Sequence, residues 1–299
     1  YPLLVACISM KKLTQTQQKL VDVGQEILAE DDSRPGYLHS CLCQVGLPRS
    51  NQSRDWFSRR TGRSSILVEA GSIDDGVNWH QLPLPYGTHP RLALVHLSAE
   101  AVRTRNPAID VSRGIKHFLR NMGISINGKN WRMFRKQMTY LAAAHVTIGF
   151  SDADGKQRTV KANPVRELSL WSDPITAQQG LWPDEIVLDS EFYKSLIEHA
   201  VPLDHRAVAA LSHSSLALDI YCWLSHRLYR VKSPVPISWA ALHAQFASEV
   251  SDWRTLKRSF KIALPKVLAV YPRARVEVED GGIRLYKSPP PIQKHYPLQ

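Results

Sequence analysis

Few residues in this chain are arranged in a way that could perform covalent chemistry. Residues 123–129 (GISINGK) match the glycine and lysine spacing of a phosphate-binding loop. Such a loop needs Ser or Thr after the lysine and a strand before the first glycine, but Asn130 follows the lysine and a helical pattern precedes it. No His-x-His pair that could hold a metal beside a nucleophilic tyrosine occurs. We therefore expect no catalytic residues and no enzymatic activity.

The cysteines indicate neither a metal site nor a disulfide framework. His39, Cys41 and Cys43 could supply half of a metal site, but no second pair follows at the usual spacing. The chain has four cysteines, and those at 41 and 43 are too close in sequence for an ordinary disulfide. We expect no metal, no other cofactor and a reducing compartment.

The overall charge is the feature that points to a ligand. The 299 residues include 38 Lys and Arg against 27 Asp and Glu, a net charge of +11 with His neutral. Such an excess is typical of proteins that bind polyanions, nucleic acids above all. Hydrophobic residues make up 43% of the chain, enough for a buried core. No apolar run approaches the roughly 20 residues that cross a bilayer, so disordered and membrane-spanning classes are excluded.

The positive charge is concentrated in two stretches. Residues 111–136 contain seven Lys and Arg and no Asp or Glu. Residues 251–299 contain ten Lys and Arg against four acidic residues. In the second stretch, cations recur at three- and four-residue spacing and should line one face of a helix. These four residues are Arg254, Lys257, Arg258 and Lys261.

Hydrophobic periodicity predicts three helices and a hairpin in the middle of the chain. The expected helices span residues 90–104, 112–122 and 130–144, and the expected strands 145–150 and 157–160. Ser112 should cap the second helix and Gly123 should end it. Asp152 and Asp154 could form a carboxylate pair, but beside Gly155 they are better explained as a hairpin turn.

The same order of elements recurs near the carboxyl end. The expected helices span residues 216–228 and 239–246, followed by a longer helix from residue 252 that buries Leu256, Phe260, Ala263 and Val267. The expected strands span residues 274–279 and 283–286. Ser238 should cap the short helix and Ser251 the last one, which should kink or end near Leu264 because Pro265 lacks a donor N–H. Three helices followed by a hairpin is the order of a winged helix-turn-helix. Further helices are expected near 191–199 and 204–211, after a loop with edge-strand character at 171–189.

The sequence therefore predicts an α+β fold with two tandem winged helix-turn-helix domains and a partly extended N-terminal lead-in. The lead-in holds a helix at 13–29 and, within residues 33–90, one strand at 65–69. The expected domains are residues 1–85 for the lead-in, 86–188 and 189–291 for the winged helices, and 292–299 for a tail. Met10 is the expected natural start. No targeting segment is recognised, so we expect a cytoplasmic protein.

The third helix of each domain is expected to enter the major groove of DNA, with the hairpin beside it on the backbone. The alternative is a solvated basic face, but two copies favour DNA. The candidate contacts of the first domain are Lys129, Arg132, Arg135 and Lys136 on the helix, with Lys156, Arg158 and Lys161 on the hairpin. Those of the second domain are Arg254, Lys257, Arg258 and Lys261 on the helix, with Arg284 and Lys287 on the hairpin.

Several stretches together resemble the RepA-type plasmid replication initiators. The resemblance runs from about residue 47 to residue 291. Its most specific parts are PYGTHPR at 85–91, EAVRT at 100–104, the helix end at 118–123, PLDHRA at 202–207, SSLALDIY at 214–221, ISWAALHAQF at 237–246 and VYPRA at 270–274. Two features depart from the family pattern: residues 127–130 replace a Gly-rich entry to the third helix, and Pro265 interrupts the last one.

The resemblance implies a protein that binds directly repeated origin sequences, the iterons, on double-stranded plasmid DNA. It further implies local opening of the duplex and recruitment of the host initiator and replicative helicase. Such initiators can form homodimers, repress their own synthesis and limit copy number. A winged-helix transcriptional repressor without a replication role is the alternative. An RNA-binding protein would need aromatic stacking platforms, and most aromatic residues here fall on apolar stripes.

The charge pattern predicts how substitutions on the last long helix affect binding. Arg254→Ala or Arg258→Ala should cost about 1 to 3 kcal/mol and relax base choice, because arginine reads guanine edges. Lys257→Ala or Lys261→Ala should weaken binding to all sequences alike and lower the salt dependence by about one unit each, as for phosphate contacts. Titration of origin DNA at several salt concentrations measures both effects. A quadruple alanine variant with unchanged affinity would contradict the assignment, and Trp239→Ala serves as an unfolding control.

Overall fold

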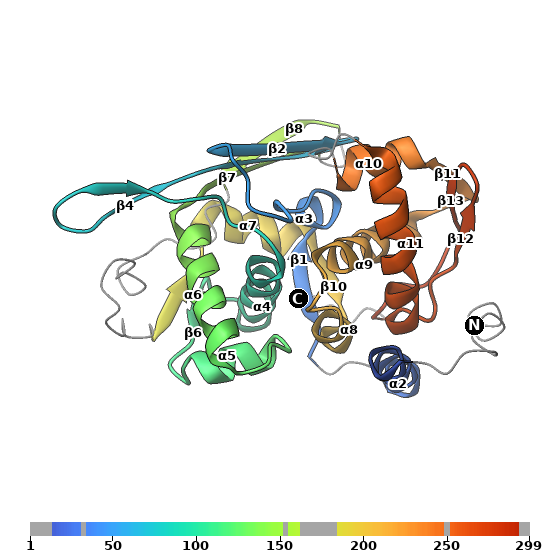
Figure 1. The fold of residues 1–299 in the computed structure, drawn as a ribbon, viewed down its shortest axis with the longest axis horizontal. Helices are drawn as coiled ribbons and strands as arrows, with labels where there is room; N and C mark the ends of the chain where they lie inside the picture. Colours follow the sequence, from blue (N-terminus) through green and yellow to red (C-terminus); the bar gives the residue numbers. More distant parts are fainter. Residues whose placement is uncertain (1–13, 31–33, 152–154, 162–183, 248–251, 293–299) are drawn as a thin grey trace. The chain divides into compact units, whose positions relative to one another are not determined.

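The computed structural model describes residues 14–30, 34–151, 155–161, 184–247 and 252–292, and its fold mixes α-helices with several small β-sheets (Figure 1). The mixed α+β class predicted from the sequence is confirmed. Met10, the turn at 152–154, the loop at 171–183, Ser251 and most of the expected tail lie outside the described residues.

Contacts divide the chain into two compact units. Residues 37–201 form the central unit. The residues before 37 and those after 201 together form the terminal unit, which is therefore discontinuous in sequence. The domains expected from the sequence were consecutive, and none of them joined the N-terminal helix to the carboxyl-terminal elements.

Four of the five described helices of the central unit match predicted helices, and the short one at residues 40–44 was not predicted. The five helices are α3 (Ser40–Gln44), α4 (Thr88–Thr104), α5 (Ile115–Asn121), α6 (Gly128–Ala143) and α7 (Ser190–His199). Gly123 ends α5 with a φ of 68°, as expected for a glycine at this position. Ser112 does not cap α5, contrary to prediction: its N–H is bound by the Asp110 carboxylate, and Gly114 occupies the cap.

A four-stranded antiparallel sheet is the largest described sheet of this unit. Its strands are β2 (Trp56–Thr61), β3 (Ser64–Glu69), β7 (His145–Ser151) and β8 (Gln157–Lys161), in the order β2-β3-β7-β8. The predicted hairpin thus exists, but β7 also pairs with the whole of β3. Helices α3 and α7 pack against the sheet.

The lead-in is more ordered than the sequence predicted, because β2 and β3 belong to this sheet. The pattern of β2 was missed because its inward positions are occupied by Phe57 and by an arginine. Arg59 is only 3% exposed, and its guanidinium donates to the carbonyl of Gly46 at 3.5 Å. A charged residue that faces inward breaks the polar and apolar alternation by which a strand is recognised.

The described residues form three further sheets that are each a pair of short strands, besides a three-stranded sheet of the terminal unit. They are β1 (Gly36–His39) with β10 (Ala200–Leu203), β4 (Ser72–Asp74) with β5 (Trp79–Gln81), and β6 (Ala108–Asp110) with β9 (Glu185–Val187). The β4–β5 hairpin extends away from the helices of the central unit (Figure 1). Its turn is ordered by the Asp75 carboxylate, which accepts from the N–H groups of Val77 and Asn78.

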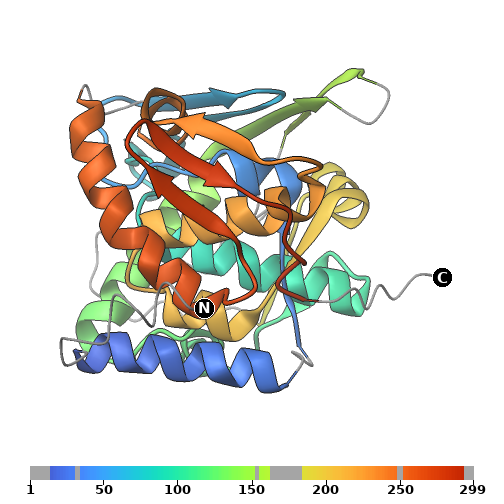
Figure 2. The same cartoon turned by 90° about the vertical axis from the view of Figure 1, so that its right-hand side faces the viewer.

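The terminal unit contains the second predicted copy. Its elements are α2 (Gln15–Ala29), α8 (His205–Ala210), α9 (Ser215–Arg227), β11 (Val235–Ser238), α10 (Trp239–Phe246), α11 (Trp253–Val270), β12 (Val276–Glu279) and β13 (Gly282–Leu285), with a 3-10 turn at Leu228–Arg230. The three strands pair in the order β11-β13-β12 and lie beside α11 (Figure 2). The helices and the hairpin predicted here are confirmed.

The ends of α10 and α11 show which local signals were correct. Ser238 caps α10, and its hydroxyl accepts from the N–H of Ala241. Asp252 caps α11 in place of the expected Ser251. The helix continues through Pro265 to Val270, so an end at Leu264 was a wrong expectation. Pro265 is exposed, so the carbonyl that it deprives of a partner can be hydrated instead.

Helix α2 packs against α8 and the carboxyl end of α11, with Leu20, Gly24 and Ile27 buried (Figure 2). Gly24 permits this approach, because a Cβ atom there would lie 1.9 Å from the carbonyl oxygen of Ala269.

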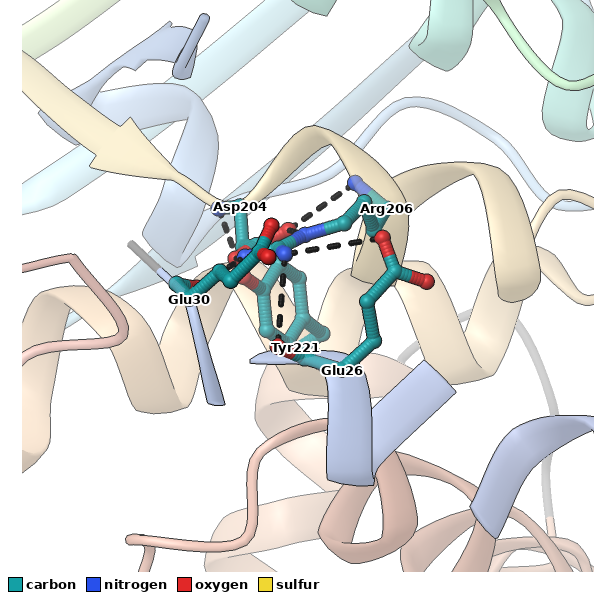
Figure 3. A network of polar contacts seen from close by, with 5 residues as sticks. All are labelled: Glu26, Glu30, Asp204, Arg206 and Tyr221. Atoms are coloured by element: carbon teal, nitrogen blue, oxygen red, sulfur yellow. Dashed lines mark hydrogen bonds and ion pairs between the residues drawn. The ribbon is translucent and has the colours of Figure 1, made fainter. Parts of the chain in front are cut away.

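The carboxyl end of α2 is held by one arginine of α8 (Figure 3). The Arg206 guanidinium donates to the carbonyl of Glu30 at 3.0 Å and to the buried Asp204 carboxylate at 2.8 Å. The N–H of Asp204 donates to the hydroxyl of Tyr221 at 2.9 Å. The last carbonyls of a helix lack intrahelical partners and attract cations, so Arg206 joins α2 to the rest of the unit.

The close contact at Gly24 predicts that replacing this helical glycine by alanine destabilises the protein. Gly→Ala within a helix normally stabilises by about 1 kcal/mol. Gly24→Ala should instead lower the free energy of unfolding by about 1 to 3 kcal/mol, because α2 and α11 must separate to admit the methyl group. Urea denaturation measures the change, with Gln25→Ala on the exposed side of α2 as the control. A Gly24→Ala protein as stable as the original would show that the two backbones do not meet.

His39 predicts a pH-dependent stability. Its side chain is fully buried; Nδ1 accepts from the N–H of Cys41 at 3.1 Å, and Nε2 lies 3.0 Å from the Ser195 hydroxyl. Burial, with a smaller repulsion from His199, lowers the pKa of His39 from 6.5 to about 3. The neutral ring therefore contributes stability that is complete above pH 6.5 and is lost as the pH falls toward 3, by about 1.4 kcal/mol per unit.

His39→Asn tests this dependence, because asparagine keeps a capping acceptor for α3 and removes the titrating group. The unfolding free energy of the variant should fall less steeply between pH 6.5 and pH 4 than that of the original chain. Parallel pH profiles would contradict the assignment.

Candidate nucleic-acid interface

The exposed face of α11 is the clearest cationic surface in the terminal unit. The helix carries five Lys and Arg and no acidic residue. Arg254, Arg258 and Lys261 are exposed. The opposite side is buried against the unit through Leu256, Phe260, Ala263, Leu264 and Val267. Local amphipathicity thus positions these three cations together, as the spacing predicted.

An apolar side chain missed by the sequence analysis lies on the same face. Ile262 is 61% exposed and follows Arg258 by one helical turn. An apolar group at such a position can contact the methyl group of thymine. Isoleucine in an amphipathic helix is ordinarily assigned to the core. The one sequence signal against that assignment is its position four residues after Arg258, on the side of the helix where the cations recur.

Lys257 is placed differently from the other three cations. It is half-buried at the flank of α11. Its Nζ donates to the carbonyl of Asp280 at 3.3 Å and lies 5.3 Å from the centre of the Trp239 ring. The structure therefore does not group Lys257 with Arg254, Arg258 and Lys261.

The β12–β13 hairpin is nearly neutral. Between residues 274 and 288, three cations (Arg275, Arg284 and Lys287) face three acids (Glu277, Glu279 and Asp280). Arg284 Nε lies 2.5 Å from Glu279 Oε1, and this carboxylate raises the pKa of Arg284. Lys287 is exposed. Of the two cations predicted on this hairpin, Arg284 is thus engaged in an ion pair.

In the central unit, α6 presents a second cationic face. Its four Lys and Arg are accompanied by no acidic residue. Lys129, Arg132 and Lys136 are exposed, whereas Arg135 is half-buried with its guanidinium 5.6 Å from the centre of the Trp131 ring. Trp131 is itself half-buried. The side chain of Asn127 caps the helix by accepting from the N–H of Asn130.

The neighbouring β7–β8 hairpin adds further cations. Lys156, Arg158 and Lys161 are exposed on or beside β8, the edge strand of the four-stranded sheet. Arg158 Nη1 lies 4.0 Å from Glu198 Oε2 of α7. An exposed pair at this distance contributes little to stability.

The polar groups considered for other chemistry have structural roles here. His39 and Cys41 are buried, the lone pair of His39 Nδ1 is occupied, and burial raises the pKa of the Cys41 thiol to about 12. Among the described residues, no group of three or more His, Cys, Asp and Glu side chains is arranged to hold a metal ion. Within the same ranges, no helix has the length and apolar character needed to cross a membrane.

The fold is similar to that of two domains of a known protein. One crystal structure of domains 2 and 3 of RctB superposes with a TM-score of 0.53 at 11% identity, covering 83% of this chain and 98% of that one. A second structure of RctB domains 2-3 gives a TM-score of 0.51 at 11% identity, covering 82% and 94%. This likeness shows that the chain shares the fold of the RctB domains.

The sequence itself shows the family. The family described as plasmid encoded RepA protein matches residues 84–240, slightly more than half of the chain. The chain therefore belongs to this family of plasmid replication initiators, as the resemblance in its motifs indicated. No curated protein sequence matches the chain.

The balanced charge of the β12–β13 hairpin predicts that one of the expected DNA contacts, Arg284, contributes little to affinity. Arg284→Ala should change the affinity for DNA less than threefold, because Glu279 already neutralises its guanidinium, whereas Arg258→Ala should weaken binding about tenfold or more. Glu279→Gln should instead tighten binding to DNA at low salt by releasing Arg284. Equal losses for Arg284→Ala and Arg258→Ala would show that the ion pair opens on the DNA.

Proposed function

We propose that this chain initiates plasmid replication by binding repeated origin sequences through α11 and α6. Membership of the plasmid replication initiator family supports the proposal. The observation that carries its mechanism is the pair of helices, one in each unit, that combine a buried apolar side with an exposed cationic side free of acidic residues. A helix of this kind can enter the major groove and reach both phosphates and guanine edges.

In this proposal, each unit contains a winged helix-turn-helix. In the terminal unit α9, α10 and α11 supply the helices, and β12–β13 supplies the wing. In the central unit α4, α5 and α6 are followed by β7–β8, which is extended by β3 and β2 into a larger sheet. The two wings differ in charge, so the first grips the backbone through Lys156, Arg158 and Lys161, and the second depends on its helix.

The proposed sequence of events is binding to iterons, local duplex opening and recruitment of the host initiator and replicative helicase. The chain performs no covalent chemistry and acts in the cytoplasm. Formation of a homodimer would allow it to repress its own gene and limit copy number. Membership of the family supports these steps, and adjacent DNA-bound copies are able to distort the duplex between them.

Footprinting the purified chain across its own upstream DNA tests the proposal. The expected result is protection of several direct repeats of roughly 20 base pairs, beside an AT-rich segment that becomes reactive to single-strand probes, since unpairing is easiest there. Protection of a single palindrome without such opening would indicate a transcriptional repressor instead.

Two sets of substitutions separate the contributions of the units. One variant has alanine at four positions of α6: Lys129, Arg132, Arg135 and Lys136. The other has alanine at the three exposed cations of α11. Each variant should shorten the footprint on one side of a repeat and reduce the salt dependence of DNA affinity by several units. Unchanged footprints in both variants would contradict the assigned surfaces. Circular dichroism and thermal unfolding serve as folding controls.

A further inference from the structure

Three elements of the terminal unit meet at the turn between β12 and β13. The carbonyl of Asp280 accepts two hydrogen bonds, from Trp239 Nε1 of α10 at 3.0 Å and from Lys257 Nζ of α11 at 3.3 Å. The N–H of Trp239 also donates to the carbonyl of Gly281 at 3.0 Å. The turn is thus joined to the start of α10 and to the first turns of α11.

Close backbone packing holds the same turn from its other side. A Cβ atom on Gly282 would lie 1.9 Å from the carbonyl oxygen of Ile237, so β13 and β11 approach as closely as glycine allows. The turn therefore has little freedom relative to β11 and α10. Its position relative to α11 depends on the side chains that connect them.

Lys257 is suited to make this connection. Its ammonium lies over two indole rings, 5.3 Å from the centre of Trp239 and 5.9 Å from that of Trp253. An ammonium over an aromatic face is attracted by the negative charge of that face. With a carbonyl and two rings close to it, the ammonium has fewer free directions for a phosphate than the exposed Lys261, which follows it on the same helix.

We propose that Lys257 is a positioning residue rather than a DNA ligand, and that it sets the angle between the cationic face of α11 and the β12–β13 turn. The proposal rests on the proposed function of α11 and revises the phosphate contact that the spacing of Lys257 predicted. Lys257 acts on DNA binding through Arg254 and Arg258, whose approach to the bases requires the correct setting of the helix.

The experiment compares Lys257→Met with Lys261→Met, which removes the same charge from an exposed position of the same helix. Affinity is measured against salt concentration, on a duplex selected from random sequence by the full chain and on an unrelated duplex. Lys261→Met should lower the salt slope by about 0.9 and weaken both duplexes. Lys257→Met should leave the slope unchanged, weaken the selected duplex about tenfold and leave the unrelated duplex within about twofold.

A rescue variant separates positioning from general loss of stability. Lys257→Arg retains a cation over the two rings and a donor for the Asp280 carbonyl, and it should restore affinity for the selected duplex to within about twofold. A salt slope that falls in Lys257→Met as it does in Lys261→Met would overturn the proposal, because Lys257 would then meet a phosphate. Unchanged affinity for both duplexes would overturn it as well.

Hydrogen exchange without DNA keeps this test independent of the proposed function. Amides of residues 279–283 should exchange several-fold faster in Lys257→Met than in the original chain or in Lys261→Met, because the turn loses its connection to α11. Faster exchange there supports the connection even if the chain binds no specific DNA. Exchange that is equal in all three proteins would show that Lys257 does not hold the turn.

Discussion

The arrangement of the terminal unit depends on burying one side of α11 while its charged side stays in water. Its cations lie three and four residues apart with no acid among them, and each such like-charged pair costs a few tenths of a kcal/mol. Each fully buried Leu, Phe or Val on the other side contributes about 1.5 to 3 kcal/mol. The apolar side therefore outweighs the repulsion, and the helix can present a cationic surface without losing its fold.

Net charge alone is a poor guide to which cations can bind DNA, because several are used within the fold. Arg206 donates hydrogen bonds to a carbonyl at the carboxyl end of α2 and to the buried carboxylate of Asp204. Arg91, only 8% exposed, donates to the carbonyls of Leu47, Pro48 and Gly87. Buried guanidinium groups need such partners, so these residues stabilise loops and helix ends. Most of the cations on α6, on α11 and on the β7–β8 edge are exposed instead.

The two helix faces are supported in different ways. The hairpin after α6 is two strands of a four-stranded sheet that extends into the N-terminal part of the central unit. The hairpin after α11 pairs with β11 and connects to α11 through Lys257 and to α10 through Trp239. The first hairpin keeps a positive edge and the second balances its charges internally. The two copies share an order of elements without sharing the interactions that hold their hairpins.

The sequence by itself determined the elements whose signals are local. The cap at Ser238, the end of α5 at Gly123 and the amphipathic pattern of α11 depend on residues within a few positions of one another. The one-signed charge of α6 and α11 was likewise visible in the chain, as was the resemblance to the family. These signals were sufficient for the α+β class and for most members of the two cationic faces.

Only the tertiary structure decided what depends on residues distant in sequence. The pairing of β3 with β7 and the packing of α2 against α11 join segments about 80 residues apart or more, and the Arg59 side chain meets the carbonyl of Gly46 thirteen residues away. The same applies to charge: the spacing of Lys257 placed it on the cationic face, but the carbonyl of Asp280 and two indole rings lie close to its ammonium. The spacing of residues in a helix determines on which side of the helix a side chain lies. The groups that the side chain contacts there are supplied by the rest of the fold.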